Sequence, residues 1–228
     1  MTQINKVYNS PRTAVDSDIY VVGSIEAPEN YLDEFQTLRE AKSQENIRII
    51  INSGGGNLDT AVQFINCMRD SSANIISSIE GMCHSAATLM FLTADQWSVS
   101  PNCLMLVHNY SGGAYGKGNE IKQSVVATDD WVKGVMRDTY KGFLTEEEME
   151  KLFLNQDFWF DSAEIERRLL NVIALREKMV DEEEEAHKLS LISQLEILRE
   201  TMATKEEEEE SFDEGQDIEG VPSSTEEL

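Results

Sequence analysis

Short apolar runs alternate along the first half of the chain with segments whose apolar residues recur at helical spacing. Residues 18–25 (DIYVVGSI) form the first run, and the apolar residues of 31–38 then recur every three or four positions. The same order repeats with the run at 47–52 and the stripe at 58–68. A short apolar run is typical of a buried strand, and helical spacing is typical of an amphipathic helix. The alternation therefore predicts strand, helix, strand, helix.

The pattern continues beyond residue 70. An apolar run at 74–81 leads through small residues to an apolar helix at 85–94, and a further run follows at 103–109. Strands that alternate with helices favour a parallel sheet that is covered on both faces. The chain has 228 residues, of which 40% are hydrophobic, enough for one substantial core. We therefore predict an α/β fold.

A long polar helix is expected at about 119–143, after a glycine-rich turn or ribbon at 110–118. This helix lies outside the sheet pattern, yet it carries an apolar stripe formed by Ile121, Val125, Val132, Val135 and Met136. An apolar stripe needs a surface to cover it, so we expect a partner surface here. Thr145 and the glutamates after it predict a fresh helix cap.

The acidic charge of the chain is concentrated near its C-terminus. Asp and Glu number 43 against 19 Lys and Arg, for a net charge of −24, and residues 177–228 account for −15 of it. Such a balance leaves no basic surface for DNA or RNA, so nucleic acid is excluded as a partner. Runs of glutamate bracket an amphipathic stretch at 187–205, and this tail is predicted to be partly helical or disordered, a solvated segment or a docking helix.

Membrane and metal sites are not expected. No stretch approaches the roughly 20 apolar residues of a membrane-spanning helix, and residues 1–18 form a polar arm without a signal-peptide core. We predict a cytoplasmic protein. Its cysteines, Cys67, Cys83 and Cys103, lack the paired spacing of a zinc site and are expected to be reduced and buried. No cofactor is predicted.

Glycines follow the strand predicted at 47–52, in the string INSGGG. Gly54, Gly55 and Gly56 would let the backbone approach a ligand closely and direct N–H groups at developing negative charge. The same string could be a simple turn. No Lys-Ser/Thr pair follows it, which disfavours a nucleotide-binding loop.

Ser85 opens the apolar helix at 85–94, in GMCHSAATLMF. A serine at a helix N-terminus is most often a cap. The same position suits a nucleophile, because the helix dipole and the N–H of Ala86 would stabilise an oxyanion. The residues alone leave both interpretations open.

His108 ends the strand predicted at 103–109 and is the best-placed candidate base for a distant nucleophile. His84, adjacent to Ser85, is a poor candidate because its ring would point elsewhere on a strand-to-helix turn. The acid that orients the base is Asp157 or Asp161 in NQDFWFDSAE, and sequence logic does not separate them. Asp161 also fits the N-cap of a helix starting near Ser162.

Taken in order, INSGGG, GMCHSAATLMFLTAD, MLVHNYSGGAYGKGNEI and DFWFDSAEI resemble the proteolytic subunit of the Clp protease, ClpP, and especially its divergent bacteriophage members. The resemblance covers roughly residues 19–175. Four motifs in order are far more specific than any single one. It implies a ClpP/crotonase-like fold with a protruding handle helix at about 119–143, through which heptameric rings pair.

The resemblance also implies roles for individual residues. Ser85 would be the nucleophile, His108 the general base and acid, and Asp157 the third member of the triad. The oxyanion N–H groups would be those of Gly56 and Ala86. Substrate would add as a strand between the Gly54–Leu58 segment and residues 110–116, with Gly54, Gly55, Ser111, Gly112 and Gly113 as substrate-binding residues.

Partners and domains follow from the same resemblance. The predicted domains are an arm at 1–18, a protease domain at 19–176 and an acidic tail at 177–228. Polypeptide substrates, a homo-oligomer of seven or fourteen copies and an AAA+ unfoldase are the expected partners, and the acidic tail resembles segments of phage head-maturation enzymes. The glycine that the family has near Arg168 is absent, so the last helix is expected to run on.

Two other functions share this fold. A catalytically silent ring protein could use the acidic tail to recruit partners. Acyl-CoA chemistry, as in crotonase relatives, would use the same oxyanion groups, but it needs no Ser85–His108 pair, and the negative charge disfavours CoA phosphates. Our leading hypothesis is a serine endopeptidase.

Overall fold

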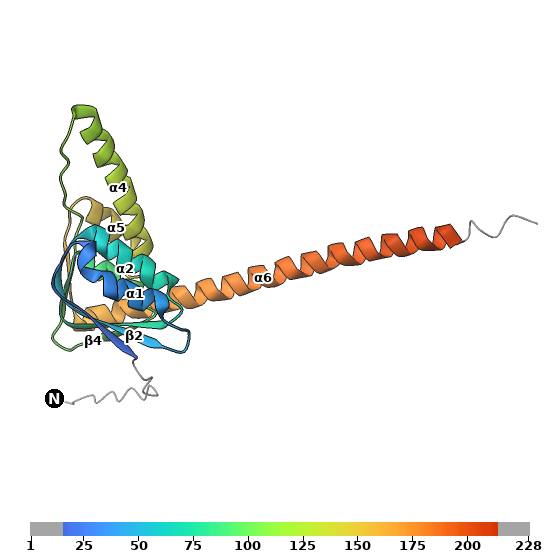
Figure 1. Cartoon of the computed structure of the whole chain (residues 1–228), viewed down its shortest axis with the longest axis horizontal. Helices are drawn as coiled ribbons and strands as arrows, with labels where there is room; N and C mark the ends of the chain where they lie inside the picture. Colours follow the sequence, from blue (N-terminus) through green and yellow to red (C-terminus); the bar gives the residue numbers. More distant parts are fainter. Residues whose placement is uncertain (1–15, 214–228) are drawn as a thin grey trace, which may run out of the picture. The chain divides into compact units, whose positions relative to one another are not determined.

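The computed structural model describes residues 16–213 (Figure 1). The chain divides between Ile173 and Ala174 into two compact units, which are taken in turn. The expected arm at 1–18 lies almost entirely outside the described residues, as does the end of the tail beyond 213.

Unit 1 is built on a six-stranded sheet in the order β1-β2-β3-β5-β6, with β4 paired to β3. The strands are β1 (Ser17–Ile25), β2 (Asn46–Gly56), β3 (Asn74–His84), β4 (Gln96–Val99), β5 (Leu104–Val107) and β6 (Phe158–Asp161). All pairs are parallel except β5 with β6. The predicted α/β class is confirmed. The antiparallel pair was not foreseen, because a four-residue edge strand has no periodicity that gives its direction.

The helices cover this sheet and contribute to one core. They are the 3-10 turn η1 (Pro28–Tyr31), α1 (Leu32–Glu40), α2 (Leu58–Asp70), α3 (Ala86–Thr93), α4 (Gly118–Tyr140), α5 (Glu146–Phe153) and α6 (Ser162–Asp213). Helix α3 is buried from Ala86 through Leu92 and contacts β2, β3, α2 and α4. All three cysteines are free and buried. Helix α3, which follows the candidate nucleophile, is thus held on several sides.

Two strands are longer than the sequence predicted. Strand β2 continues through its glycines, and Gly56 still pairs with Ile25 after a register shift at Gly23. Strand β3 runs to His84, directly before Ser85. The predicted strand ends at residues 52 and 81 were wrong, because glycine was taken as an end signal. In this sheet, irregular pairing accommodates the glycines.

Helix α4 is packed over only part of its length. Val132, Met136 and Tyr140 in its second half are buried, whereas Val125 and Trp131 are 49% and 43% exposed. Figure 1 shows its first turns extending beyond the layers of unit 1. Within the described chain, the predicted apolar stripe is therefore buried in the second half of α4 and open in the first half.

Both predicted caps near the end of unit 1 are present. Thr145 and Glu148 form a reciprocal capping box at the start of α5. The Asp161 carboxylate accepts the Glu164 N–H at 2.9 Å and caps α6. These bonds satisfy N–H groups that have no partner within their own helices.

In unit 2, residues 174–213 continue helix α6. The last helix runs on, as expected from the missing glycine near Arg168, and no glycine or proline occurs between 162 and 213 to end it. Apolar side chains on it are exposed, namely Met179, Val180, Leu189, Leu191, Ile192, Leu195 and Ile197. Within the described residues, no helix combines the length and apolar character needed to cross a membrane.

Candidate active site

Ser85 is the single residue between the end of β3 and the start of α3. Its backbone has φ 56° and ψ −129°, a left-handed conformation that a non-glycine residue rarely adopts. Such strain costs on the order of 1–3 kcal/mol and clusters at functional sites. The hydroxyl makes no capping bond to the helix. The cap interpretation of Ser85 is therefore wrong.

The end of β2 presses against this turn. A Cβ atom on Gly55 would lie 2.6 Å from both the Ser85 Cβ and the His84 carbonyl oxygen, so only glycine fits there. Ser53 holds the glycine segment, because its Oγ donates to the Gly23 carbonyl at 2.6 Å and accepts the Gly55 N–H at 3.0 Å. The backbone of β2 is thereby fixed beside Ser85.

A small cavity of about 80 Å³ opens at this point. Ser85, His108, Gly56 and Ala86 all line it, together with Leu58, Leu89, Tyr110, Ser111, Val132, Met136 and Tyr140. Four residues predicted to carry the chemistry are thus brought together from the ends of β2, β3 and β5. Ala86 is the first residue of α3, where backbone N–H groups lack helical partners and the helix dipole favours negative charge.

The tautomer of His108 follows from one hydrogen bond. Its Nδ1 lies 2.6 Å from the Asn109 carbonyl oxygen. A carbonyl only accepts, so Nδ1 carries a proton, and in the neutral ring Nε2 then has the lone pair. Over residues 16–213, no hydrogen bond joins the His108 ring to Ser85 or to Asp157. Nε2 is the nitrogen with the capacity to accept a proton from a serine hydroxyl.

Asp157 lies just before β6, is exposed and makes no hydrogen bond to the described part of the chain. Strands β5 and β6 pair with Val107 opposite Phe158. The pairing ends at these two residues, and the next positions beyond it are His108 after β5 and Asp157 before β6. Asp161 instead uses its carboxylate as the cap of α6. Asp161 thus has a capping role that Asp157 does not have.

His84 is next to Ser85 but does not line the cavity. Its ring packs edge-on against Trp159 with centroids 5.4 Å apart. Burial, and secondarily the nearby His108, lower the pKa of His84, so its neutral form is favoured. Its Nε2 is buried without a hydrogen-bond partner among the described residues.

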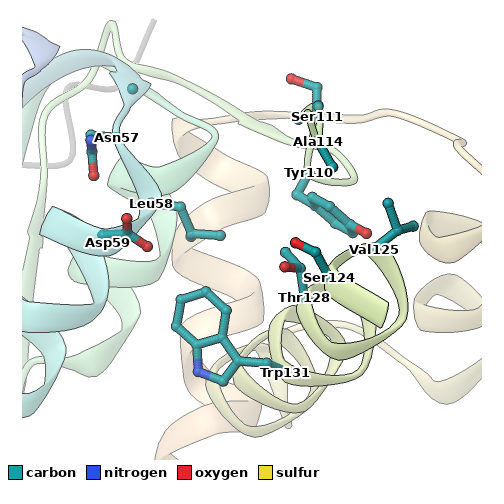
Figure 2. A pocket seen from close by; sticks show the side chains of 13 residues that line it. Asn57, Leu58, Asp59, Tyr110, Ser111, Ala114, Ser124, Val125, Thr128 and Trp131 are labelled. Carbon is teal, nitrogen blue, oxygen red and sulfur yellow. The ribbon is translucent and has the colours of Figure 1, made fainter. Parts of the chain in front are cut away.

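A wider groove of about 420 Å³ adjoins the cavity and shares Gly56, Leu58, Tyr110 and Ser111 with it (Figure 2). Its other lining residues are Asn57, Asp59, Gly112, Gly113, Ala114, Ser124, Val125, Thr128 and Trp131. The predicted substrate residues Ser111, Gly112 and Gly113 are among the lining groups, whereas Gly54 and Gly55 line neither space. In Figure 2, the α2 start and helix α4 form opposite sides of the groove.

Several polar residues at the site escaped the sequence analysis. Tyr110 lines both spaces, and its hydroxyl donates to Asp129 at 3.1 Å. Burial, and then Asp129, raise the pKa of Tyr110. Thr88 and Tyr140 were also missed, although a hydroxyl inside an apolar stretch is a signal that could have found Thr88. In the described ranges, no cluster of three or more His, Cys, Asp or Glu side chains could hold a metal ion.

The family model described as Clp protease matches residues 7–168, which is most of unit 1. A search of curated proteins found no match.

Proposed function

The chain belongs to the Clp protease family, and on that premise we propose that it cleaves polypeptides with a Ser85–His108–Asp157 triad. Membership implies serine endopeptidase activity of the general ClpP kind, and members of the family generally form rings that act on polypeptides. The residue roles, the size of the ring and its partners are our proposal.

In the proposed reaction, Ser85 Oγ attacks the peptide carbonyl carbon while His108 Nε2 takes the hydroxyl proton. The N–H groups of Gly56 and Ala86 bind the oxyanion that forms. The tetrahedral intermediate collapses, His108 gives its proton to the leaving amine, and an acyl-enzyme remains on Ser85. Water then attacks the ester with His108 again as base, which releases the acid and restores the hydroxyl.

Asp157 is proposed to orient His108 and to stabilise the imidazolium. When its carboxylate turns toward the ring, it accepts the hydrogen bond from Nδ1–H that the Asn109 carbonyl accepts otherwise. Both acceptors favour the same tautomer, with Nε2 free to act as the base. The register of β5 with β6 supports this assignment.

The observation that carries the proposal is the cavity at the strand ends. Ser85, in a left-handed turn that its hydroxyl does not cap, shares that cavity with the imidazole of His108 and with two backbone segments suited to an oxyanion. A helix cap or a buried structural serine has no need of this arrangement.

We further propose that substrate lies in the groove of Figure 2 as an extended chain between the start of α2 and residues 110–114. The open apolar part of α4 supports assembly into a ring of seven or a paired ring of fourteen. The proposed ring is fed by an AAA+ unfoldase or acts in phage head maturation, and the cytoplasm is the proposed compartment.

A fluorophosphonate probe tests the chemistry directly, because it reacts only with an activated serine. Wild-type protein should become labelled and should cleave a fluorogenic peptide, whereas Ser85→Ala should do neither. Ser190→Ala, at an exposed position of α6, is the matched control and should behave as wild type. Wild-type protein that resists the probe would favour the silent ring protein, a reading consistent with the absence of a Ser85–His108 hydrogen bond over residues 16–213. Native mass spectrometry gives the number of subunits.

A further inference from the structure

Two buried hydroxyls form a chain that ends on the backbone of Ser85. Tyr140, the last residue of α4, is 1% exposed, and Thr88 in α3 is 0% exposed. The Tyr140 hydroxyl lies 2.6 Å from Thr88 Oγ1, and Thr88 Oγ1 lies 2.6 Å from the Ser85 carbonyl oxygen. Nothing in the proposed triad uses these groups, although Tyr140 lines the same cavity as Ser85.

The direction of both hydrogen bonds is fixed by the last acceptor. A carbonyl oxygen carries no proton, so Thr88 donates to Ser85. Thr88 has one hydroxyl proton, and Tyr140 must therefore donate to Thr88. Burial raises the pKa of Tyr140, which keeps its phenol protonated and able to donate. Each hydroxyl orients the next.

The orientation of this carbonyl bears on the oxyanion site. The Ser85 carbonyl and the Ala86 N–H belong to one planar peptide unit, so a bond that fixes the oxygen also fixes the direction of the N–H. The Thr88 N–H donates to the same oxygen at 2.9 Å, which leaves one bond in place when the hydroxyl is removed. The hydroxyl chain therefore refines an orientation that the helix already favours.

We propose that Tyr140, acting through Thr88, is a positioning residue that holds the Ser85–Ala86 peptide in the orientation needed for oxyanion binding. The inference rests on the proposed function, because it concerns the rate of attack at Ser85. It adds a link between the end of α4 and the reacting centre. An oxyanion donor that is removed outright costs about 10²–10³ in kcat, so an N–H that is only loosened should cost less, about tenfold.

The test compares Tyr140→Phe with Thr139→Val. Thr139 is the preceding residue of α4, and its buried hydroxyl has no hydrogen-bond partner in the described chain, so Thr139→Val removes a matched hydroxyl outside the proposed chain. Tyr140→Phe should lower kcat and the maximal rate of fluorophosphonate labelling about tenfold, with KM and the native mass unchanged. Thr139→Val should leave kcat, the labelling rate, KM and the native mass at the wild-type level.

Thr88 supplies the rescue experiment. Thr88→Val should reproduce the loss in kcat, and Thr88→Ser, which keeps the hydroxyl, should restore most of it. Adding Tyr140→Phe to Thr88→Val should cost nothing more, because the two hydroxyls act in series. The Thr88 pair keeps the idea testable if Tyr140→Phe does not fold.

The results separate this inference from the proposed function. A wild-type protein that is active and labelled, with Tyr140→Phe at the wild-type kcat, overturns the positioning role alone. A loss in kcat shared equally by Thr139→Val, or a change confined to KM, overturns it as well. A wild-type protein that is not labelled removes the proposed function, and the inference falls with it.

Discussion

Arg168 stabilises the junction of α5, α6 and β6 through one buried guanidinium. Its N–H groups donate to both carboxylate oxygens of Glu148 at 2.7 and 2.9 Å, to Glu164 at 2.7 Å and to the Phe143 carbonyl at 2.9 Å. The guanidinium also lies 4.3 Å from the ring centroid of Phe160. This paired fork is the geometry in which an arginine–carboxylate pair is strongest.

The contribution of Arg168 to the free energy of unfolding can be worked out from the pKa of Glu148. Hydrogen bonding to Arg168 lowers the pKa of Glu148 from 4.5 to about 2. At about 1.4 kcal/mol for each pKa unit, the interaction has a ceiling of about 3 kcal/mol, which water reduces because the Glu148 side chain is 21% exposed. The Phe143 carbonyl would lose a charged donor, worth about 1.5 kcal/mol or more. Arg168→Met should therefore cost about 3 kcal/mol.

Urea unfolding at pH 7 measures this cost, with every variant at the same protein concentration. A loss of about 3 kcal/mol corresponds to a Tm lower by roughly 6–12 °C for a chain of this size. Arg69→Met is the control, because it removes an exposed pair with Asp138 whose side chains are 48% and 61% exposed. Such a pair contributes about 1 kcal/mol or less.

The pH dependence of this stability difference gives a second test of the Arg168–Glu148 interaction. Because the pKa of Glu148 is lower in the folded chain, its contribution is complete above about pH 4.5 and is lost as the pH falls toward 2. The difference between wild type and Arg168→Met should shrink over that window. A variant Arg168→Met as stable as Arg69→Met, or a difference that stays constant down to pH 2, would refute the reasoning.

Three further predictions concern the site and its surroundings. Asp157→Asn should lower kcat by about 10²–10⁴ and leave the stability to urea unchanged, since this carboxylate makes no hydrogen bond to the described residues; an unaltered kcat would remove Asp157 from the triad. Trp131→Ala should raise the KM for peptides with little change in kcat, as measured by steady-state cleavage, because its side chain lines the groove and not the cavity. Gly55→Ala should slow fluorophosphonate labelling at least a hundredfold, as its Cβ would displace Ser85; Gly134→Ala, where a Cβ meets nothing within 4 Å, should label as wild type.

The order of strands and helices could be predicted because each depends on local spacing. The runs at 18–25 and 47–52 are strands β1 and β2, and the helical stripes that follow them are α1 and α2. The first run was expected to be buried, but Tyr20 and Val22 are exposed because β1 is an edge strand with one open face. Directions and ends depend on pairing with distant residues. Strand β2 continues through its glycines because β1 pairs with them, and no local pattern contains that information.

For the candidate site too, features that depend on local sequence could be predicted, and features that depend on distant partners could not. Ser85, Gly56 and His108 were found because each follows an apolar run, and parallel strands bring such ends to one edge of a sheet. Asp157 could not be chosen over Asp161 from spacing alone. The proposed choice of Asp157 rests on the register of β6 with β5 and on the bond from the Glu164 N–H to Asp161. Tyr140 was missed because its partner is 52 residues away.

The two halves of the site also differ in how firmly they are built. The serine half rests on the long parallel pairing of β2 with β3, and the close approach of Gly55 leaves its backbone no room to shift. The imidazole half rests on β5 and β6, two strands of four residues that end beside an exposed Asp157. A short edge pair opens locally at lower free energy than the centre of a sheet. The proposed oxyanion groups are thus held more firmly than the proposed pair of His108 and Asp157.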